Sequence, residues 1–146
     1  MNRIAKLIAI AAALAAFGTA AQAAPAVSLD SAVFVERAAP AGRMLQPASD
    51  LSRGDRVVYV VNWYKLGGDG GFVVTNPLPR TVYYQGSANG DEEVSIDGGR
   101  TWGKLATMRA GSRAATPEDV THVRWRVDPR TASRGQGRIA YSAIVR

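Results

Sequence analysis

The sequence contains no cysteine and only one histidine, His122. Without cysteine no disulfide bond can support the fold, so a hydrophobic core must stabilise it. The same absence rules out a lipidated N-terminal cysteine and a cysteine nucleophile. Structural zinc sites are built from clusters of cysteine and histidine, and no serine lies in a Gly-x-Ser-x-Gly turn. We therefore expect no metal site, no cofactor and no catalytic residue, and we predict that the protein is not an enzyme.

Long apolar runs are also missing, apart from one near the start. The first 23 residues have the parts of a secretory signal peptide: a basic start at Arg3 and Lys6, an apolar run from Leu7 to Phe17, and the small-residue cleavage site Ala21-Gln22-Ala23. The apolar run is shorter than the roughly 20 residues that span a membrane. We predict cleavage after residue 23 and export of one domain, residues 24–146, which is periplasmic or secreted and keeps no membrane span. A retained anchor helix is the alternative interpretation.

The chain is basic, with a formal charge of +6, and arginine supplies most of the positive charge. After the predicted cleavage site the only lysines are Lys65 and Lys104. The basic residues are spread along the chain and form no run, a pattern that argues against nucleic-acid binding.

Apolar and polar residues alternate with a period of two through most of the remaining chain, as in half-buried β-strands. We predict strands over residues 32–37, 56–66, 72–75, 81–85, 93–97, 121–127 and 138–145. Segment 38–52, rich in Ala, Pro and Ser, is predicted to be a loop that carries the chain to a second sheet. Asp97-Gly98-Gly99 indicates a hairpin turn, and Thr116-Pro117-Glu118-Asp119 indicates a single helical turn capped by Thr116. About seven short strands separated by turns predict an all-β protein, an antiparallel β-sandwich.

The predicted strand 56–66 is apolar on both of its faces. One face, predicted to point into the core, is formed by Val57, Tyr59, Val61 and Trp63. Val58, Val60 and Tyr64 point the other way, where a half-solvated sheet usually carries polar side chains. Either another part of the chain, such as Pro40–Pro47, covers this second face, or a partner does, because exposed apolar area usually marks an interaction site. Val58, Val60 and Tyr64 are therefore a candidate interaction face.

A second candidate face lies on the predicted strand 121–127. His122, Arg124 and Arg126 share one side of this strand, and the apolar residues between them share the other. These three side chains are a candidate anion-binding face. A solvated basic surface over a buried Trp125 is the plainer interpretation.

An acidic triplet, Asp91-Glu92-Glu93, follows Asn89-Gly90 in a predicted loop. Clustered carboxylates are suited to calcium, which takes roughly six to eight oxygen ligands. The spacing does not match that of a known calcium-binding loop. The sequence therefore leaves two interpretations open, a calcium site and a plain acidic turn.

Several short motifs follow one another along residues 30–146. They are Leu51-Ser52-Arg53-Gly54-Asp55 leading into Val57-Val58-Tyr59-Val60-Val61-Asn62, then Val74-Thr75-Asn76-Pro77-Leu78-Pro79, Gly86-Ser87-Ala88, Val94-Ser95-Ile96-Asp97-Gly98-Gly99-Arg100-Thr101-Trp102, Val123-Arg124-Trp125 and Gly135-Gln136-Gly137. In this order they resemble the domain-of-unknown-function 11 family, the conserved repeat domain of bacterial exported and surface proteins. The resemblance implies an immunoglobulin-like β-sandwich, no general catalytic function and a role in the cell envelope. The family usually occurs as tandem copies, whereas this chain holds one.

These observations predict an exported, non-enzymatic β-sandwich module that binds another protein of the cell envelope. The alternative function is binding of an anionic envelope polymer through His122, Arg124 and Arg126.

Overall fold

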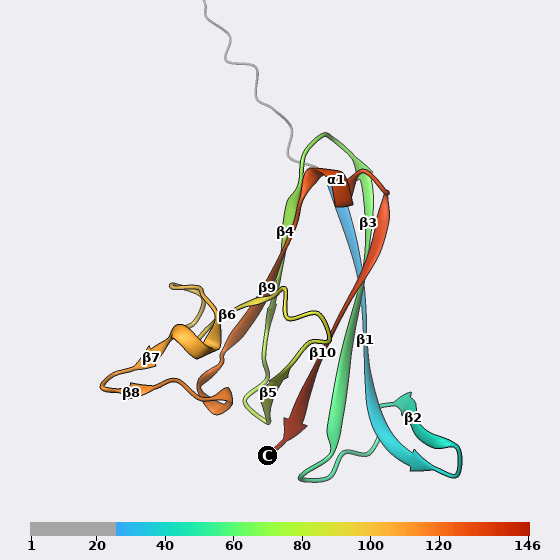
Figure 1. Ribbon diagram of the computed structural model, residues 1–146. Coiled ribbons are helices and arrows are strands. Elements are labelled where there is room, and N and C mark those ends of the chain that lie inside the picture. The colour runs from blue at the N-terminus through green and yellow to red at the C-terminus, as the bar shows by residue number, and fades with distance from the viewer. Residues whose placement is uncertain (1–25) are drawn as a thin grey trace, which may run out of the picture.

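The computed structural model describes residues 26–146, so the predicted signal peptide lies outside the described residues. The predicted all-β fold is confirmed, because strands dominate and neighbouring strands run antiparallel. Two sheets face each other and form a β-sandwich (Figure 1).

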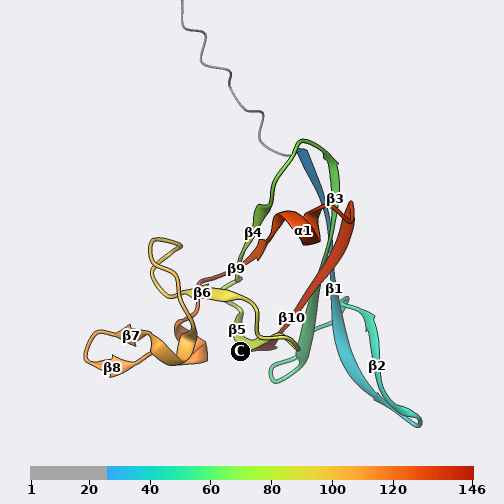
Figure 2. The same ribbon diagram turned by 45° about the horizontal axis from the view of Figure 1, so that its top comes forward.

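The larger sheet, sheet A, has the strand order β2-β1-β3-β10-β5, and the smaller, sheet B, has the order β4-β9-β6. Sheet A contains β1 (Ala26–Ala39), β2 (Gly42–Pro47), β3 (Arg56–Gly67), β5 (Val82–Gly86) and β10 (Gln136–Val145). Sheet B contains β4 (Phe72–Pro77), β6 (Glu93–Ser95) and β9 (His122–Val127). The connections contain η1 (Leu105–Thr107), η2 (Pro117–Asp119), α1 (Pro129–Ala132) and a small hairpin of β7 (Arg109–Ala110) and β8 (Arg113–Ala114). This hairpin projects from the sandwich beside β6 (Figure 2).

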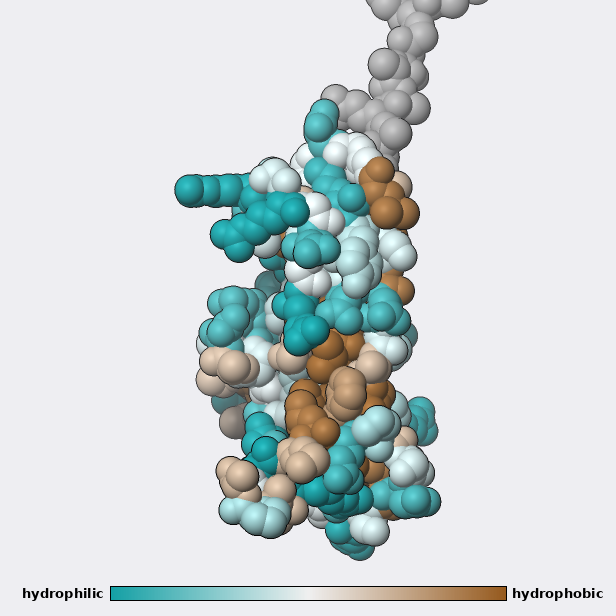
Figure 3. All heavy atoms as spheres, turned by 90° about the vertical axis from the view of Figure 1, so that its right-hand side faces the viewer, coloured by the Kyte–Doolittle hydropathy of each residue, from teal (hydrophilic) through white to brown (hydrophobic). Residues whose placement is uncertain are grey.

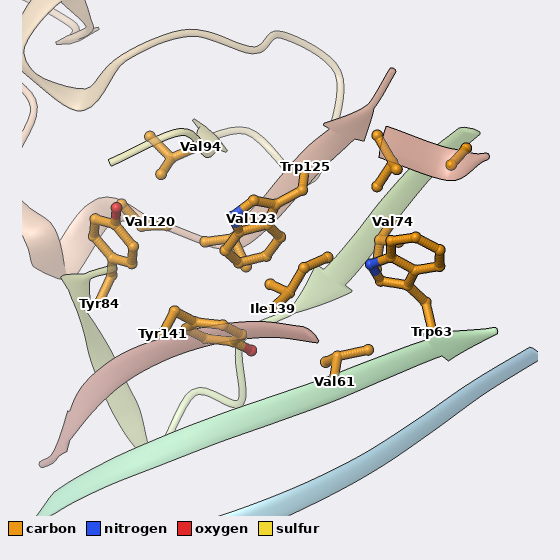
Figure 4. Packing of buried hydrophobic residues seen from close by; sticks show 12 residues of the cluster. Val61, Trp63, Val74, Tyr84, Val94, Val120, Val123, Trp125, Ile139 and Tyr141 are labelled. Carbon is orange, nitrogen blue, oxygen red and sulfur yellow. The ribbon is translucent and has the colours of Figure 1, made fainter. Parts of the chain in front are cut away.

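The hydrophobic core fills the space between the two sheets. Its buried residues include Val61, Trp63, Ile139 and Tyr141 from sheet A and Val74, Val94, Val123 and Trp125 from sheet B (Figure 4). Aromatic rings join the layers: Trp63 meets Phe72 edge-on with centroids 5.1 Å apart, and Trp125 lies 5.3 Å from Tyr141. Such pairs contribute about 0.5–1.5 kcal/mol beyond the area they bury. Strand β3 places its predicted row inward, since Val57, Val61 and Trp63 are buried and Tyr59 is partly buried.

The prediction of a loop over residues 38–52 is wrong for most of the segment, and only residues 48–52 and the turn at 40–41 lie outside strands. Strand β1 starts at Ala26, runs on to Ala39, and turns at Pro40 and Ala41 into β2, which pairs with β1 in the same sheet. Every residue of β2 is exposed. Because neither face of β2 is buried, its sequence has no apolar alternation from which a strand could be predicted.

Local signals predicted the turns better. Thr116 caps η2, Pro117 takes its first position, and Thr116 and Asp119 form a capping box. Asp97-Gly98-Gly99 is a turn in which both glycines have positive φ, but it closes on a single bridge between Val94 and Gly103 and not on a full hairpin. Helix α1 was not predicted, although Asp128 caps it by accepting a hydrogen bond from the Thr131 N–H at 2.9 Å.

Candidate interaction surfaces

The face of sheet A that points away from the core carries an apolar band. Pairing between β1 and β3 sets Phe34 beside Val58 and Ala32 beside Val60, and β10 adds Ala140 next to Val60. Directly paired residues of an antiparallel sheet project to the same side, so these five side chains form one surface, which we call the outer face. Ala32 and Ala140 are exposed, and the other three are partly exposed. The brown band in Figure 3 shows this apolar surface.

Tyr64, the third residue of the candidate interaction face, lies further along the same side of β3. It is 40% exposed and pairs with Ser28 on one strand and Gln136 on the other. Both neighbours are polar, so Tyr64 lies beyond the apolar band and not inside it. The band thus extends mainly sideways, toward β1 and β10, and less along β3.

The segment Pro40–Pro47 does not cover the outer face. It forms the turn and strand β2 beside β1, and so widens sheet A without adding a layer. Within residues 26–146, neither buried hydrophobic cluster includes Val58 or Val60. The outer face is therefore open in this part of the chain.

Polar side chains frame the apolar band on two sides. At the end of the sheet where β1 turns into β2, Glu36 pairs with Arg43 and lies 3.5 Å from Arg56. Arg56 also donates a hydrogen bond to the Ser142 hydroxyl at 3.2 Å. Toward the other end, the Arg138 Nε–H donates to the side-chain oxygen Oδ1 of Asn62 at 3.1 Å. An apolar centre with a polar rim is the usual arrangement of a protein–protein interface.

One carboxylate, Glu93, offsets part of the positive charge of the candidate anion-binding face on β9. Arg124 Nε lies 2.7 Å and Arg126 Nε 3.1 Å from the same Glu93 oxygen. The hydrogen bond from Arg124, together with the second arginine, holds the pKa of Glu93 below its ordinary value. The Arg124 guanidinium also lies 4.4 Å above the Trp102 ring, and its side chain is only 18% exposed.

His122 lies in the same row, and the side chains it contacts, Thr121 and Trp102, are uncharged. Its Nδ1 is 3.0 Å from the Thr121 hydroxyl, and its ring meets Trp102 edge-on at 6.4 Å. The structure thus brings His122 and Arg124 together around Trp102, with Arg126 as the more exposed member of the row. Glu93 therefore offsets one of the two arginine charges in this row.

The acidic triplet does not converge on one point. Glu92 is buried and accepts hydrogen bonds from the Tyr84 hydroxyl and from the Ser87 hydroxyl and N–H. Although burial opposes it, these hydrogen bonds hold the pKa of Glu92 below its ordinary value. Glu93 is occupied by the two arginines, and Asp91 is exposed. No group of three or more potential metal ligands occurs within residues 26–146.

A turn at residues 95–102 is built around a heavily hydrogen-bonded carboxylate, Asp97. Asp97 accepts from the hydroxyls of Ser95 (2.8 Å) and Thr101 (2.6 Å) and from the N–H groups of Arg100 (3.0 Å) and Thr101 (2.9 Å). The Thr101 hydroxyl is the strongest of these influences, and together they hold the pKa of Asp97 far below its ordinary value. These four hydrogen bonds tie Asp97 to both ends of the turn and fix its shape.

The sequence interpretation missed the role of this turn, although the spacing Ser95-x-Asp97-x-Gly99-x-Thr101-Trp102 carries its signal. Small polar residues two apart can hydrogen-bond each other's backbone in a tight turn. Trp102 is held as a consequence, since its ring N–H donates to the Gly99 carbonyl at 3.0 Å. This ring is the platform on which Arg124 rests.

A groove of about 680 Å³ opens on the side of the sandwich where β5 pairs with only the last residues of β10. Its floor includes Trp63, Trp125 and Ile139, and its rim carries Arg126 and Arg134. No sequence pattern predicts this groove, because its lining comes from segments far apart in the chain.

No family model, no curated protein and no solved structure matches the chain. Among residues 26–146, no helix is long and apolar enough to cross a membrane.

Proposed function

We propose that the protein is an exported, non-enzymatic module of the cell envelope, with an immunoglobulin-like sandwich related to the domain-of-unknown-function 11 family, that binds a partner protein on the outer face of sheet A. The observation that carries the proposal is the open apolar band around Val58 and Val60. Monomeric soluble proteins rarely expose a contiguous apolar patch of more than a few hundred Å² unless it is functional.

The charged side chains that border the apolar band favour a protein as the partner. Charges of both signs border it, with Glu36 among Arg43 and Arg56 on one side and Arg138 beside Asn62 on the other. A mixed rim suits the polar edge of a protein interface, whereas a polyanion would select a surface of one sign.

The basic row on β9 is a weaker candidate for an anionic polymer. Glu93 lies within 3.1 Å of the Nε atoms of both Arg124 and Arg126, so its negative charge weakens the attraction of this row for an incoming anion. The outer face has no such competitor among the described residues.

Photocrosslinking in intact cells tests the proposal. A photoreactive residue at Val60 should give one dominant crosslinked envelope protein, identified by mass spectrometry. The matched control carries the same residue at Arg109, an exposed position on the projecting hairpin. Crosslinks only within the chain, or the same set of products from both positions, would exclude the outer face as a specific binding site.

A further inference from the structure

Within residues 26–146, no strand pairs with the outer side of the first half of β1, which is therefore an open sheet edge in this part of the chain. Residues 26–33 pair with β3 on one side, whereas β2 begins to pair only at Phe34. All of these residues except Val27 are exposed. In Figure 1 and Figure 2, β2 accompanies only the lower part of β1.

The backbone groups on this edge point away from the sheet. The Val33 carbonyl accepts a hydrogen bond from the Ala48 N–H at 3.1 Å, which shows that Val33 turns its backbone away from β3. Hydrogen-bonding direction alternates along an antiparallel strand, so Val27, Leu29 and Ser31 do the same. Their N–H and C=O groups are therefore available to another strand.

The neighbouring edge strand of sheet A, β2, carries Arg43 and ends in Pro47. Charges and prolines are the devices by which proteins block edge-to-edge pairing. The open half of β1 has no proline and a single charge, Asp30. It also exposes apolar side chains on its inner side, with Leu29 50% and Val33 37% exposed.

We propose that this edge pairs with the same edge of a second copy, antiparallel about a two-fold axis at Leu29. Two sheets A then join into one continuous sheet. A second copy presents the same outward backbone groups at the same spacing, and an isologous contact of this kind closes on itself as a dimer.

Three constraints select the register centred on Leu29. Residues that turn their backbone outward must meet each other, and the register centred on Leu29 satisfies this by pairing Leu29 with its copy and Val27 with Ser31. A register centred on Asp30 would set two carboxylates directly opposite each other, which is destabilising. A register centred on Ser31 would drive Ser28 against Phe34, where β2 already lies. Centring on Leu29 instead sets Asp30 opposite the Ser28 hydroxyl and covers Leu29 with its own copy.

The expected dimer is weak and reversible. Pairing over seven residues buries less than the roughly 1,200 Å² that stable interfaces require. Sedimentation over a concentration series of the chain from Ala24 onward should therefore show a monomer–dimer equilibrium. A monomer at every concentration would refute the proposal.

Disulfide trapping tests the register. The sequence contains no cysteine, so an introduced cysteine can form a disulfide only with its own copy. In Leu29→Cys the two Cα atoms lie about 5.5 Å apart, within the range that a disulfide spans. In the control Val33→Cys, a similarly exposed position on the same side of β1, the two sites are separated by about 27 Å along the strands. Mild oxidation should crosslink the first variant and not the second. Equal rates for both variants would overturn the register.

Ser31→Pro tests the backbone pairing without removing a hydrogen bond of the fold, because the Ser31 N–H points away from β3. The substitution removes one donor per copy and should raise the midpoint concentration of dimerisation roughly twentyfold. Ser31→Thr keeps the donor and should behave like the wild type. A thermal unfolding scan of both variants confirms that the sandwich is intact. Dimerisation unchanged in a folded Ser31→Pro variant would contradict strand pairing at this edge.

Discussion

Replacement of Gly137 by alanine should destabilise the sandwich, although glycine is usually a poor residue for a strand. Gly137 lies at the start of β10, paired with Trp63 of β3. A Cβ at this position would lie 2.3 Å from Cζ2 and 2.5 Å from Cε2 of the Trp63 ring. Real contacts of this kind are longer by more than 1 Å, so the ring or the strand must move.

The ring has little room to move. Trp63 is 3% exposed and packs edge-on against Phe72. Overpacking of a filled core costs about 1–3 kcal/mol, and alanine returns about 0.5–1 kcal/mol by restricting the unfolded chain. Since the contact is short and involves a rigid ring, we expect the upper part of the range, a net loss of about 2 kcal/mol. For a domain of this size the melting temperature should fall by roughly 6–10 °C.

Urea unfolding followed by tryptophan fluorescence measures this loss, with Gly67→Ala as the matched control. Gly67 also lies in sheet A without positive φ, and a Cβ there meets nothing within 4 Å. In a Trp63→Phe background the smaller ring should make room, so Gly137→Ala should cost much less there. Equal stability of Gly137→Ala and Gly67→Ala would refute the steric argument.

Three further predictions concern a carboxylate, a buried hydrogen bond and the outer face. Asp97 has a pKa below its unfolded value, so its contribution to stability is present above about pH 4 and is lost as the pH falls below it; Asp97→Asn should flatten the decrease in melting temperature between about pH 5 and pH 2. Tyr84→Phe removes a hydroxyl that donates to buried Glu92 and should cost about 1–3 kcal/mol in urea unfolding, whereas Tyr83→Phe, one residue away and partly exposed, should be nearly neutral. Val60→Lys should change the free energy of unfolding by less than about 1 kcal/mol, because the site is partly exposed. The same substitution should abolish capture of the partner by a photoreactive residue at Val58. Retained capture would contradict the proposed binding face.

The sequence predicted those strands whose two faces differ in burial. Strand β3 was recognisable because Val57, Val61 and Trp63 are buried at alternate positions. Strand β2 was not, because an exposed edge strand carries no such pattern. The capped turn at Thr116 was predicted from four consecutive residues, since its hydrogen bonds are local.

The candidate surfaces were predictable only in part for a related reason. Which side chains share a strand face follows from alternation, so the members of both candidate faces could be named. What lies beside them depends on sheet order. Glu93 compensates Arg124 across 31 residues of chain, and Ala140 reaches Val60 from the far end of the sequence. No local pattern contains either neighbour, and together they offset part of the charge of the expected basic face and enlarge the apolar one.

The two proposed surfaces share β1 but use different parts of it. Ala32 and Phe34 contribute side chains to the outer face, whereas Leu29 and Ser31 offer their backbone groups to the open edge. Val60→Lys should therefore eliminate the partner and leave the dimer unchanged, and Ser31→Pro should do the reverse. If Ser31→Pro also eliminated the crosslinked partner, the partner would be binding the joined sheet of two copies, because the substitution leaves every side chain of the outer face in place.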